Sequence, residues 1–212
     1  MRFTIRNETL AKVEDQASFL EYLIEEYPRL LKDWTDKLDK EFQQQAEIIV
    51  DGEREIYASV YSSLTTAFDE IDYREDLFYK SMLIISYSYY EGAVKFLSKK
   101  AGTKNLIEAI CKSNNFELSE EAKNALEAIN SDTRIIRNQL VHNNMGNPQH
   151  TDDLLRISKR WNNIIFSNDE INICGSDFIL DSLHKELLVL KELCKKLGYI
   201  HHIVNTGDSS KK

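Results

Sequence analysis

Glycine and proline are scarce along this chain, and their scarcity limits the folds that are open to it. The 212 residues include 7 glycines and 2 prolines, well below average usage. Both residues punctuate regular structure, so long stretches without them favour long helices over a turn-rich β protein. Apolar residues also recur at the spacing of about 3.6 residues that marks amphipathic helices. We therefore expect an all-α fold, an up-and-down bundle of long antiparallel helices.

The apolar pattern divides this bundle into successive helices. In chain order they are expected at residues 8–27, 29–71, 73–100, 105–112, 120–142, 151–166 and 177–197. Pro28 either ends the first helix or opens the second, and the polar residues 51–54 can divide the second in two. Residues 130–132 can interrupt the helix that reaches residue 142, or Asp132 can cap a fresh helix there.

Residues that cap or stop helices support these boundaries. Ser119 and Ser176 each precede a helical pattern and are expected N-caps. Gly102 and Gly198 follow such patterns and are expected helix stops. Residues 171–174 do not continue a helical pattern, and we expect a short extended piece there.

A chain of this length is expected to form one globular unit around a substantial core. Within that unit, residues 1–50 are expected to be an N-terminal helical extension packed on the bundle. Residues 51–200 would form the bundle itself, and the polar residues 201–212 a flexible tail.

Charge and cysteine content restrict the location and the partners. The formal net charge is −8, which argues against broad, sequence-blind binding to nucleic acid. The chain has 3 widely separated cysteines, which favours a reduced, intracellular protein. No apolar run has the length of a signal peptide or of a membrane span. We therefore expect a cytoplasmic protein that does not contact membranes.

The segment over residues 133–144 gathers groups that can carry chemistry. Arg137, Asn138 and His142 bring a permanent cation, an amide and a titratable imidazole within six residues. Such a set can hold a phosphate and move a proton without a metal. The run Asn-Asn-Met-Gly-Asn-Pro over 143–148 does not favour a helix, so His142 is expected at the C-terminal end of one.

This arrangement resembles the signature of HEPN domains. That signature is an Arg, four to six residues of which the first is usually polar, and then a His. Four residues separate Arg137 from His142, and Asn138 is the polar residue after the Arg. The aromatic, Glu-containing segment over 87–94 is similar to the central helix of many HEPN chains. Together these likenesses cover residues 50–197.

The resemblance implies a metal-independent RNA endonuclease without a cofactor, and a toxin or antiviral (abortive infection) effector as its biological role. His142 would be the general acid or base, Arg137 would stabilise the phosphate, and Asn138 would orient either group. The implied partners are an RNA, with structured RNA such as tRNA among the candidates, a second copy of the chain, and an antitoxin or other regulatory protein. DNA is not expected as a substrate, because the nucleophile is the 2′-hydroxyl.

Helical geometry separates these residues into two faces. Arg134, Asn138 and His142 follow one another at i, i+4 and lie along one face. Arg137 is five residues from His142, or about 140° around an ideal helix. Either the last turn is distorted, or Arg137 works with the His142 of another copy, as the paired domains of HEPN ribonucleases would imply.

Other residues have both a functional and a structural interpretation. Glu91 lies in an otherwise apolar segment, where it either pairs with Arg134 or Arg137 or lies on a solvated strip. Tyr87, Tyr89 and Tyr90 are expected to pack in the core or an interface rather than to stack on bases.

No metal site is expected. His201 and His202 are expected to be exposed tail residues, because no carboxylate or thiol with ligand spacing lies nearby in the sequence. His150 and His184 are expected at the surface or in packing, and the cysteines are expected to be small core residues.

Two rival functions remain open at this point. The first is a non-catalytic helical interaction or regulatory module of a defence or toxin–antitoxin system, in which Arg137 and His142 bind a partner, a nucleotide or only each other. The second is a regulatory domain for nucleotidyl transfer, although the chain has no transferase signature. Arg and His in the last turn of a helix can also simply complement its carbonyl end.

Overall fold

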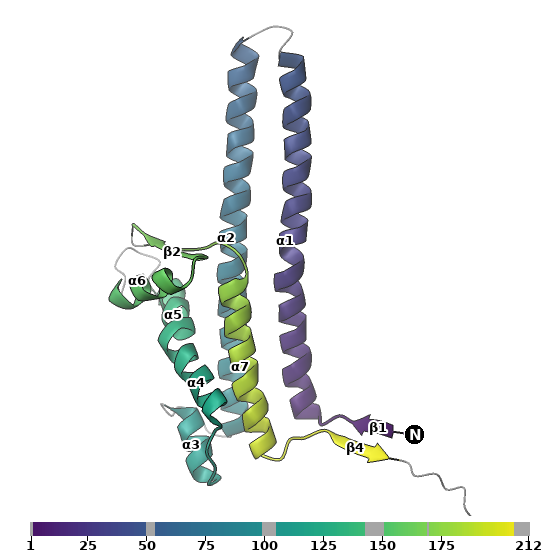
Figure 1. Cartoon of the computed structure of the whole chain (residues 1–212), viewed down its shortest axis with the longest axis vertical. Helices are drawn as coiled ribbons and strands as arrows, with labels where there is room; N and C mark the ends of the chain where they lie inside the picture. The colour runs from purple at the N-terminus through teal and green to yellow at the C-terminus, as the bar shows by residue number, and fades with distance from the viewer. Residues whose placement is uncertain (1, 50–53, 99–104, 143–150, 169, 206–212) are drawn as a thin grey trace, which may run out of the picture.

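The computed structural model describes residues 2–49, 54–98, 105–142, 151–168 and 170–205. Helices dominate these residues, and the expected all-α bundle is confirmed (Figure 1). In chain order the helices are α1 (Glu8–Ile49), α2 (Arg54–Ser98), α3 (Leu106–Ser113), α4 (Glu120–Ala128), the π-helical turn η1 (Ile129–Thr133), α5 (Arg134–His142), α6 (Thr151–Arg160) and α7 (Asp177–Lys196). None of the described helices holds an apolar stretch long enough to span a bilayer.

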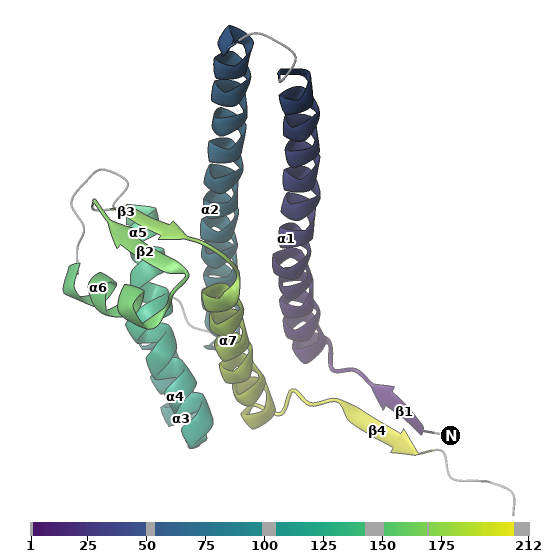
Figure 2. The same cartoon turned by 45° about the horizontal axis from the view of Figure 1, so that its top comes forward.

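The two longest helices, α1 and α2, run antiparallel and extend together beyond the rest of the bundle (Figures 1 and 2). Pro28 neither ends nor opens a helix, because it lies inside α1. Ile24 and Leu31 are buried on either side of it, and their packing holds the helix together across the backbone hydrogen bond that proline cannot donate. The predicted boundary between residues 71 and 73 is also wrong, since α2 continues through it. The predicted division at 51–54 lies mostly outside the described residues.

The core is organised around α7, which packs against α1, α2 and α4. One cluster of buried residues joins α7 to the C-terminal half of α2 and to α3 and α4, through Tyr90, Ile110 and Leu193 among others. A second cluster joins α7 to α5, α6 and the middle of α2, and includes Leu83 and Ile136. The start of α1 contributes to both clusters, so this helix is an integral part of the core.

Several predicted helix ends are confirmed in detail. The Ser119 hydroxyl accepts a hydrogen bond from the backbone N–H of Ala122 and caps α4. Gly198 adopts φ +84° directly after α7, a conformation that glycine tolerates best. Ser176 precedes α7, but its side chain does not cap the helix; its backbone carbonyl accepts from Ile179 instead. Gly102 lies outside the described residues.

The predicted helix over 151–166 is too long, because α6 ends at Arg160. The chain then forms a hairpin of β2 (Ile164–Ser167) and β3 (Glu170–Ile173), with Ile164 opposite Ile173. Both isoleucines are buried, and β-branched side chains pack well on such a strand pair. The extended piece predicted at 171–174 is confirmed.

The two ends of the described chain pair with each other. Strand β1 (Arg2–Ile5) lies antiparallel to β4 (His202–Asn205), so these residues are not a free tail. His201 is half-buried, and its Nδ1 accepts from the backbone N–H of Asn7 at 2.9 Å while its Nε2 lies 2.9 Å from Glu14. The prediction of an exposed His201 is therefore wrong, whereas His202 is exposed.

Candidate functional site

The motif residues lie on α5, which is a regular helix through His142. The irregularity is one turn earlier, in η1, where the chain forms a π-helical turn over Ile129–Thr133. The predicted interruption near 130–132 is thus present, but the alternative of a distorted last turn at His142 is wrong. Turns of this kind insert one residue into a helix and are frequent at functional sites.

His142 is the last residue of α5, and its side chain is exposed. Within the described part of the chain, no hydrogen bond or ion pair involves this imidazole. A neutral imidazole at such a position can accept a proton, and an imidazolium can donate one, without first losing a partner. The polar run predicted to follow the helix, residues 143–148, lies outside the described residues.

Arg137 turns away from His142 and packs against α2. Its Nη2 lies 3.6 Å from Oε2 of Glu91, and its Nη1 donates to Oδ1 of Asn138 at 3.0 Å. The guanidinium carbon lies 5.4 Å from the centre of the Tyr87 ring, within the range of a cation–π contact. Of the two interpretations of Glu91, the structure shows the ion pair with Arg137. These contacts fix the guanidinium in one orientation.

The Arg137 side chain is only 19% exposed, and its Nε is buried without a hydrogen-bond partner. A buried N–H of this kind is costly unless water or a ligand satisfies it. The guanidinium can therefore donate to a further partner, although Asn138 and Glu91 already engage its two Nη atoms.

Arg134 lies one turn before Arg137 on α5. It is exposed, and among the described residues it has no hydrogen bond or ion pair. Asn138 follows one turn later and is half-buried, and His142 follows after another turn. On a single chain the aligned polar groups of α5 are therefore Arg134, Asn138 and His142, whereas the Arg137 side chain packs against α2.

A buried carboxylate anchors η1 to α6. Asp132 is 6% exposed in its side chain and pairs with Arg156 at 3.2 Å and with Arg160, both on α6. The Thr133 hydroxyl donates to that of Ser182 on α7 at 2.9 Å. Asp132 is thus an anchor between η1 and α6 rather than the predicted N-cap.

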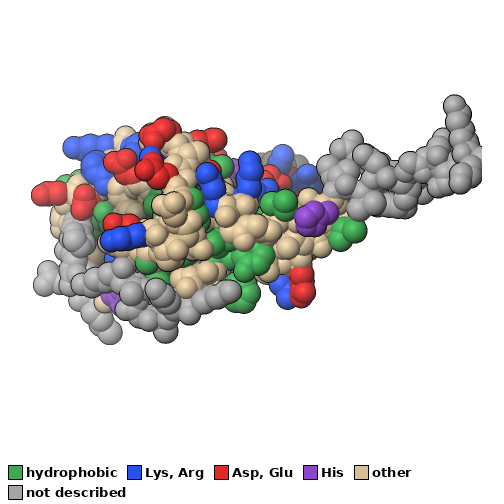
Figure 3. Space-filling view, turned by 90° about the horizontal axis from the view of Figure 1, so that it is seen from below, with side chains coloured by type: hydrophobic (Ala, Val, Ile, Leu, Met, Phe, Trp, Pro, Cys, Tyr) green, Lys and Arg blue, Asp and Glu red, His purple; other side chains and the backbone are tan. Residues whose placement is uncertain are grey.

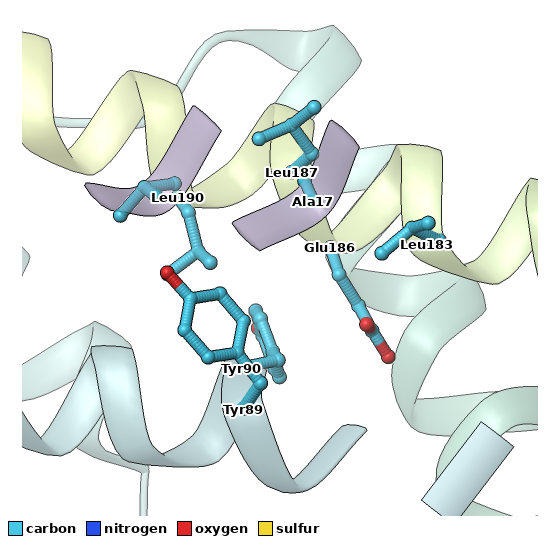
Figure 4. Close-up of a pocket in the computed structure, with 8 residues that line it drawn as sticks. Ala17, Tyr89, Tyr90, Leu183, Glu186, Leu187 and Leu190 are labelled. Carbon is cyan, nitrogen blue, oxygen red and sulfur yellow. The ribbon is translucent and has the colours of Figure 1, made fainter. Parts of the chain in front are cut away.

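One buried acid near the site was not singled out from the sequence. Glu186 on α7 is 2% exposed, and burial raises the pKa of its carboxyl from 4.5 to about 8. Figure 4 shows its side chain reaching from α7 into the space between the helices. The buried stripe of α7 could have identified it, because Ile179, Leu183, Val189 and Leu190 share a face with residue 186.

Three tyrosines of α2 lie near these groups: Tyr87 contacts Arg137, and Tyr89 and Tyr90 line a small cavity together with Glu186. Tyr87 and Tyr90 are buried and Tyr89 is partly buried, as predicted for packing residues. Burial raises the pKa of Tyr87 to about 12 and that of Tyr90 further. The Tyr90 hydroxyl is buried without a hydrogen-bond partner, whereas the Tyr89 hydroxyl donates to the backbone carbonyl of Lys12.

The remaining predicted residues lie apart from the site. Cys194 is buried, Cys111 is partly buried and Cys174 is exposed, so the core prediction is wrong for Cys174, which directly follows β3. His184 is exposed beside Glu21 at 2.8 Å, and His150 is outside the described residues. Among the described residues, no three His, Cys, Asp or Glu side chains are grouped to hold a metal ion.

The surface at the end that carries β1 and β4 mixes basic and acidic side chains (Figure 3). This face therefore lacks the broad basic surface that sequence-blind nucleic-acid binding requires. No protein-family model, curated protein or solved structure matches the chain.

Proposed function

We propose that the protein is a metal-independent RNA endonuclease of the HEPN type. The observation that carries the proposal is the exposed His142 imidazole at the end of α5, in line with Asn138 and Arg134. His142 takes the proton from a ribose 2′-hydroxyl, whose oxygen attacks the adjacent phosphorus. The bond to the 5′-oxygen breaks, and that oxygen takes a proton from water. The products are a 2′,3′-cyclic phosphate and a free 5′-hydroxyl.

Arg137 stabilises the negative charge on the phosphate as the transition state forms. Glu91 and Asn138 hold its guanidinium in place beforehand, which reduces the reorganisation needed during the reaction. Because Arg137 and His142 face about 140° apart on a regular helix, the two act on one phosphate when they come from different copies. The active form is therefore a homodimer, with Arg137 of one copy opposite His142 of the other.

The biological role that follows is a cytoplasmic toxin or antiviral effector that cuts host or invader RNA. A structured RNA such as tRNA suits a protein of net charge −8, because recognition by shape needs fewer phosphate contacts than broad electrostatic binding. A regulatory protein, such as an antitoxin, would keep the activity in check.

The test is RNA cleavage by the purified protein in the presence of a chelator. Wild-type protein is expected to release fragments with 2′,3′-cyclic phosphate ends and to leave the corresponding DNA intact. His142→Ala and Arg137→Ala are expected to reduce the rate by roughly 10²-fold or more. His184→Ala, which removes another exposed imidazole, serves as the matched control and keeps full activity. Intact RNA with wild-type protein, or cleavage that the chelator abolishes, contradicts the mechanism.

A second candidate is a non-catalytic interaction module, favoured by how fully Arg137 is engaged within its own chain. The contacts with Glu91, Asn138 and Tyr87 are also what a structural arginine would make. In that case Arg137→Ala lowers the free energy of unfolding, and expression of wild-type protein in cells causes no growth defect. A growth defect that His142→Ala removes favours the nuclease.

A further inference from the structure

A groove lies beside the candidate site, between α2 on one side and α3, α4, η1 and α5 on the other. Its volume is about 660 Å³, within the range of small-molecule sites. Two of its lining residues, Tyr87 and Glu91, also contact Arg137. The groove and the candidate site therefore share a wall.

The groove combines an apolar floor with polar groups that are free to bind a ligand. Val94 and Leu126 contribute to the floor. Lys95, Asn130 and Arg134 also line the groove, and within the described part of the chain no hydrogen bond or ion pair involves their side chains. Two of these are cations, so the polar part of the groove can pair with an anionic group such as a phosphate.

Two carboxylates give the groove its second property. Glu91 and Glu108 both line it, and an ionised carboxylate only accepts hydrogen bonds. Among the nucleobases, cytosine presents an amino donor at the position where uracil has a carbonyl acceptor, and carboxylates are the side chains that accept from that amine. The groove therefore matches a flat base with an exocyclic amine that is joined to a phosphate.

We infer that this groove is a nucleotide-binding subsite that selects a base with an exocyclic amine, such as cytosine, with Arg134 holding the phosphate. The inference rests on the proposed function for its biological meaning, since the subsite would read the RNA next to the cut. Arg137 contacts Tyr87 and Glu91, which line the groove. A base bound there therefore lies next to the phosphate that Arg137 holds in the proposed site.

The test is calorimetric binding of cytidine 5′-monophosphate to the intact protein, which needs no cleavage. Uridine 5′-monophosphate lacks the amine, and cytidine lacks the phosphate. Each is expected to bind at least about tenfold more weakly than cytidine 5′-monophosphate. Arg134→Gln is expected to weaken the binding of cytidine monophosphate about tenfold and to leave the binding of cytidine unchanged. Arg29→Gln, on the exposed surface of α1, is the matched control and changes neither.

Equal binding of the two nucleotides, unchanged binding by Arg134→Gln, or no binding at millimolar concentration overturns the subsite. The subsite and the nuclease can fail separately. Binding of cytidine monophosphate without RNA cleavage supports the subsite and rejects the nuclease. RNA cleavage without nucleotide selectivity supports the nuclease and rejects the subsite.

Discussion

The buried carboxyl of Glu186 makes stability depend on pH in a way that one substitution should remove. The side chain is 2% exposed, and one of its oxygens, Oε1, has no hydrogen-bond partner. Burial disfavours the charged form and raises the pKa from 4.5 to about 8. Ser86 opposes this shift through a hydrogen bond, but does not cancel it.

The sign of the effect follows from proton uptake. Between the unfolded pKa of 4.5 and the folded pKa of about 8, the folded protein holds a proton that the unfolded chain has released. The effect of Glu186 on the free energy of unfolding is therefore most favourable below pH 4.5. As pH rises toward 8, the free energy of unfolding falls by up to about 1.4 kcal/mol per pH unit because of this group. Between pH 5 and pH 8 the expected loss from this one group is roughly 3–4 kcal/mol.

Glu186→Gln keeps the shape of the side chain and removes the titration. Urea unfolding of wild-type and variant protein at pH 5, 6, 7 and 8 gives the difference between their free energies of unfolding. Relative to the wild type, we expect the free energy of unfolding of the variant to increase by roughly 3 kcal/mol between pH 5 and pH 8.

Glu25→Gln removes an exposed carboxylate on α1 and serves as the control. Its difference from wild type is expected to stay within about 0.5 kcal/mol at every pH. A difference for Glu186→Gln that does not change with pH would refute the reasoning, because a buried acid with a raised pKa cannot be silent in this range.

Three further substitutions test the anchors and caps by urea unfolding. Asp132→Ala removes the partner of Arg156 and Arg160 and should lower the free energy of unfolding by about 1–3 kcal/mol. The loss is smaller than for a fully buried pair, because both arginines are about half exposed and regain water. An unchanged free energy of unfolding contradicts the role of Asp132 as an anchor. Ser119→Ala removes the cap of α4 and should cost about 1 kcal/mol, and an unchanged midpoint contradicts the cap. Gly198→Ala should cost about 1 kcal/mol, since φ is +84° while no atom lies within 4 Å of the added Cβ; a gain in stability contradicts this explanation.

Local sequence signals predicted the parts of the fold that local forces determine. Ser119 precedes two glutamates and an apolar pattern, and its hydroxyl caps α4. Gly198 follows the last apolar turn of α7 and takes the left-handed conformation. In both cases the capping residue and the helix it bounds are neighbours in the chain, so tertiary packing was not needed to place them.

Features that depend on distant residues were not predicted. Pro28 is an ordinary helix breaker by local rules, yet the packing of α1 on α2 and α7 carries the helix through it. The pairing of β1 with β4 joins residues about 200 positions apart in sequence, and no local pattern specifies that partner. His201 is held by Asn7 and Glu14 for the same reason.

The candidate site divides in the same way. The alignment of Arg134, Asn138 and His142 along α5 follows from helical spacing alone; Arg134 and His142 are exposed in the structure and Asn138 is half-buried. The direction in which all four α5 residues face depends on η1, because one inserted residue rotates the whole helix that follows it by about 100°. That turn is held by Asp132 and its arginines on α6, which the sequence does not reveal as partners.

A mixing experiment tests most directly whether Arg137 and His142 from two copies form one RNA-cutting site. Arg137→Ala and His142→Ala proteins are each expected to be inactive alone. After unfolding and refolding together, half of the dimers are mixed, and each mixed dimer retains one intact Arg–His pair. The mixture should therefore recover about a quarter of wild-type cleavage in the presence of a chelator. A mixture as inactive as its components, beside an active wild type, would contradict a site shared between copies.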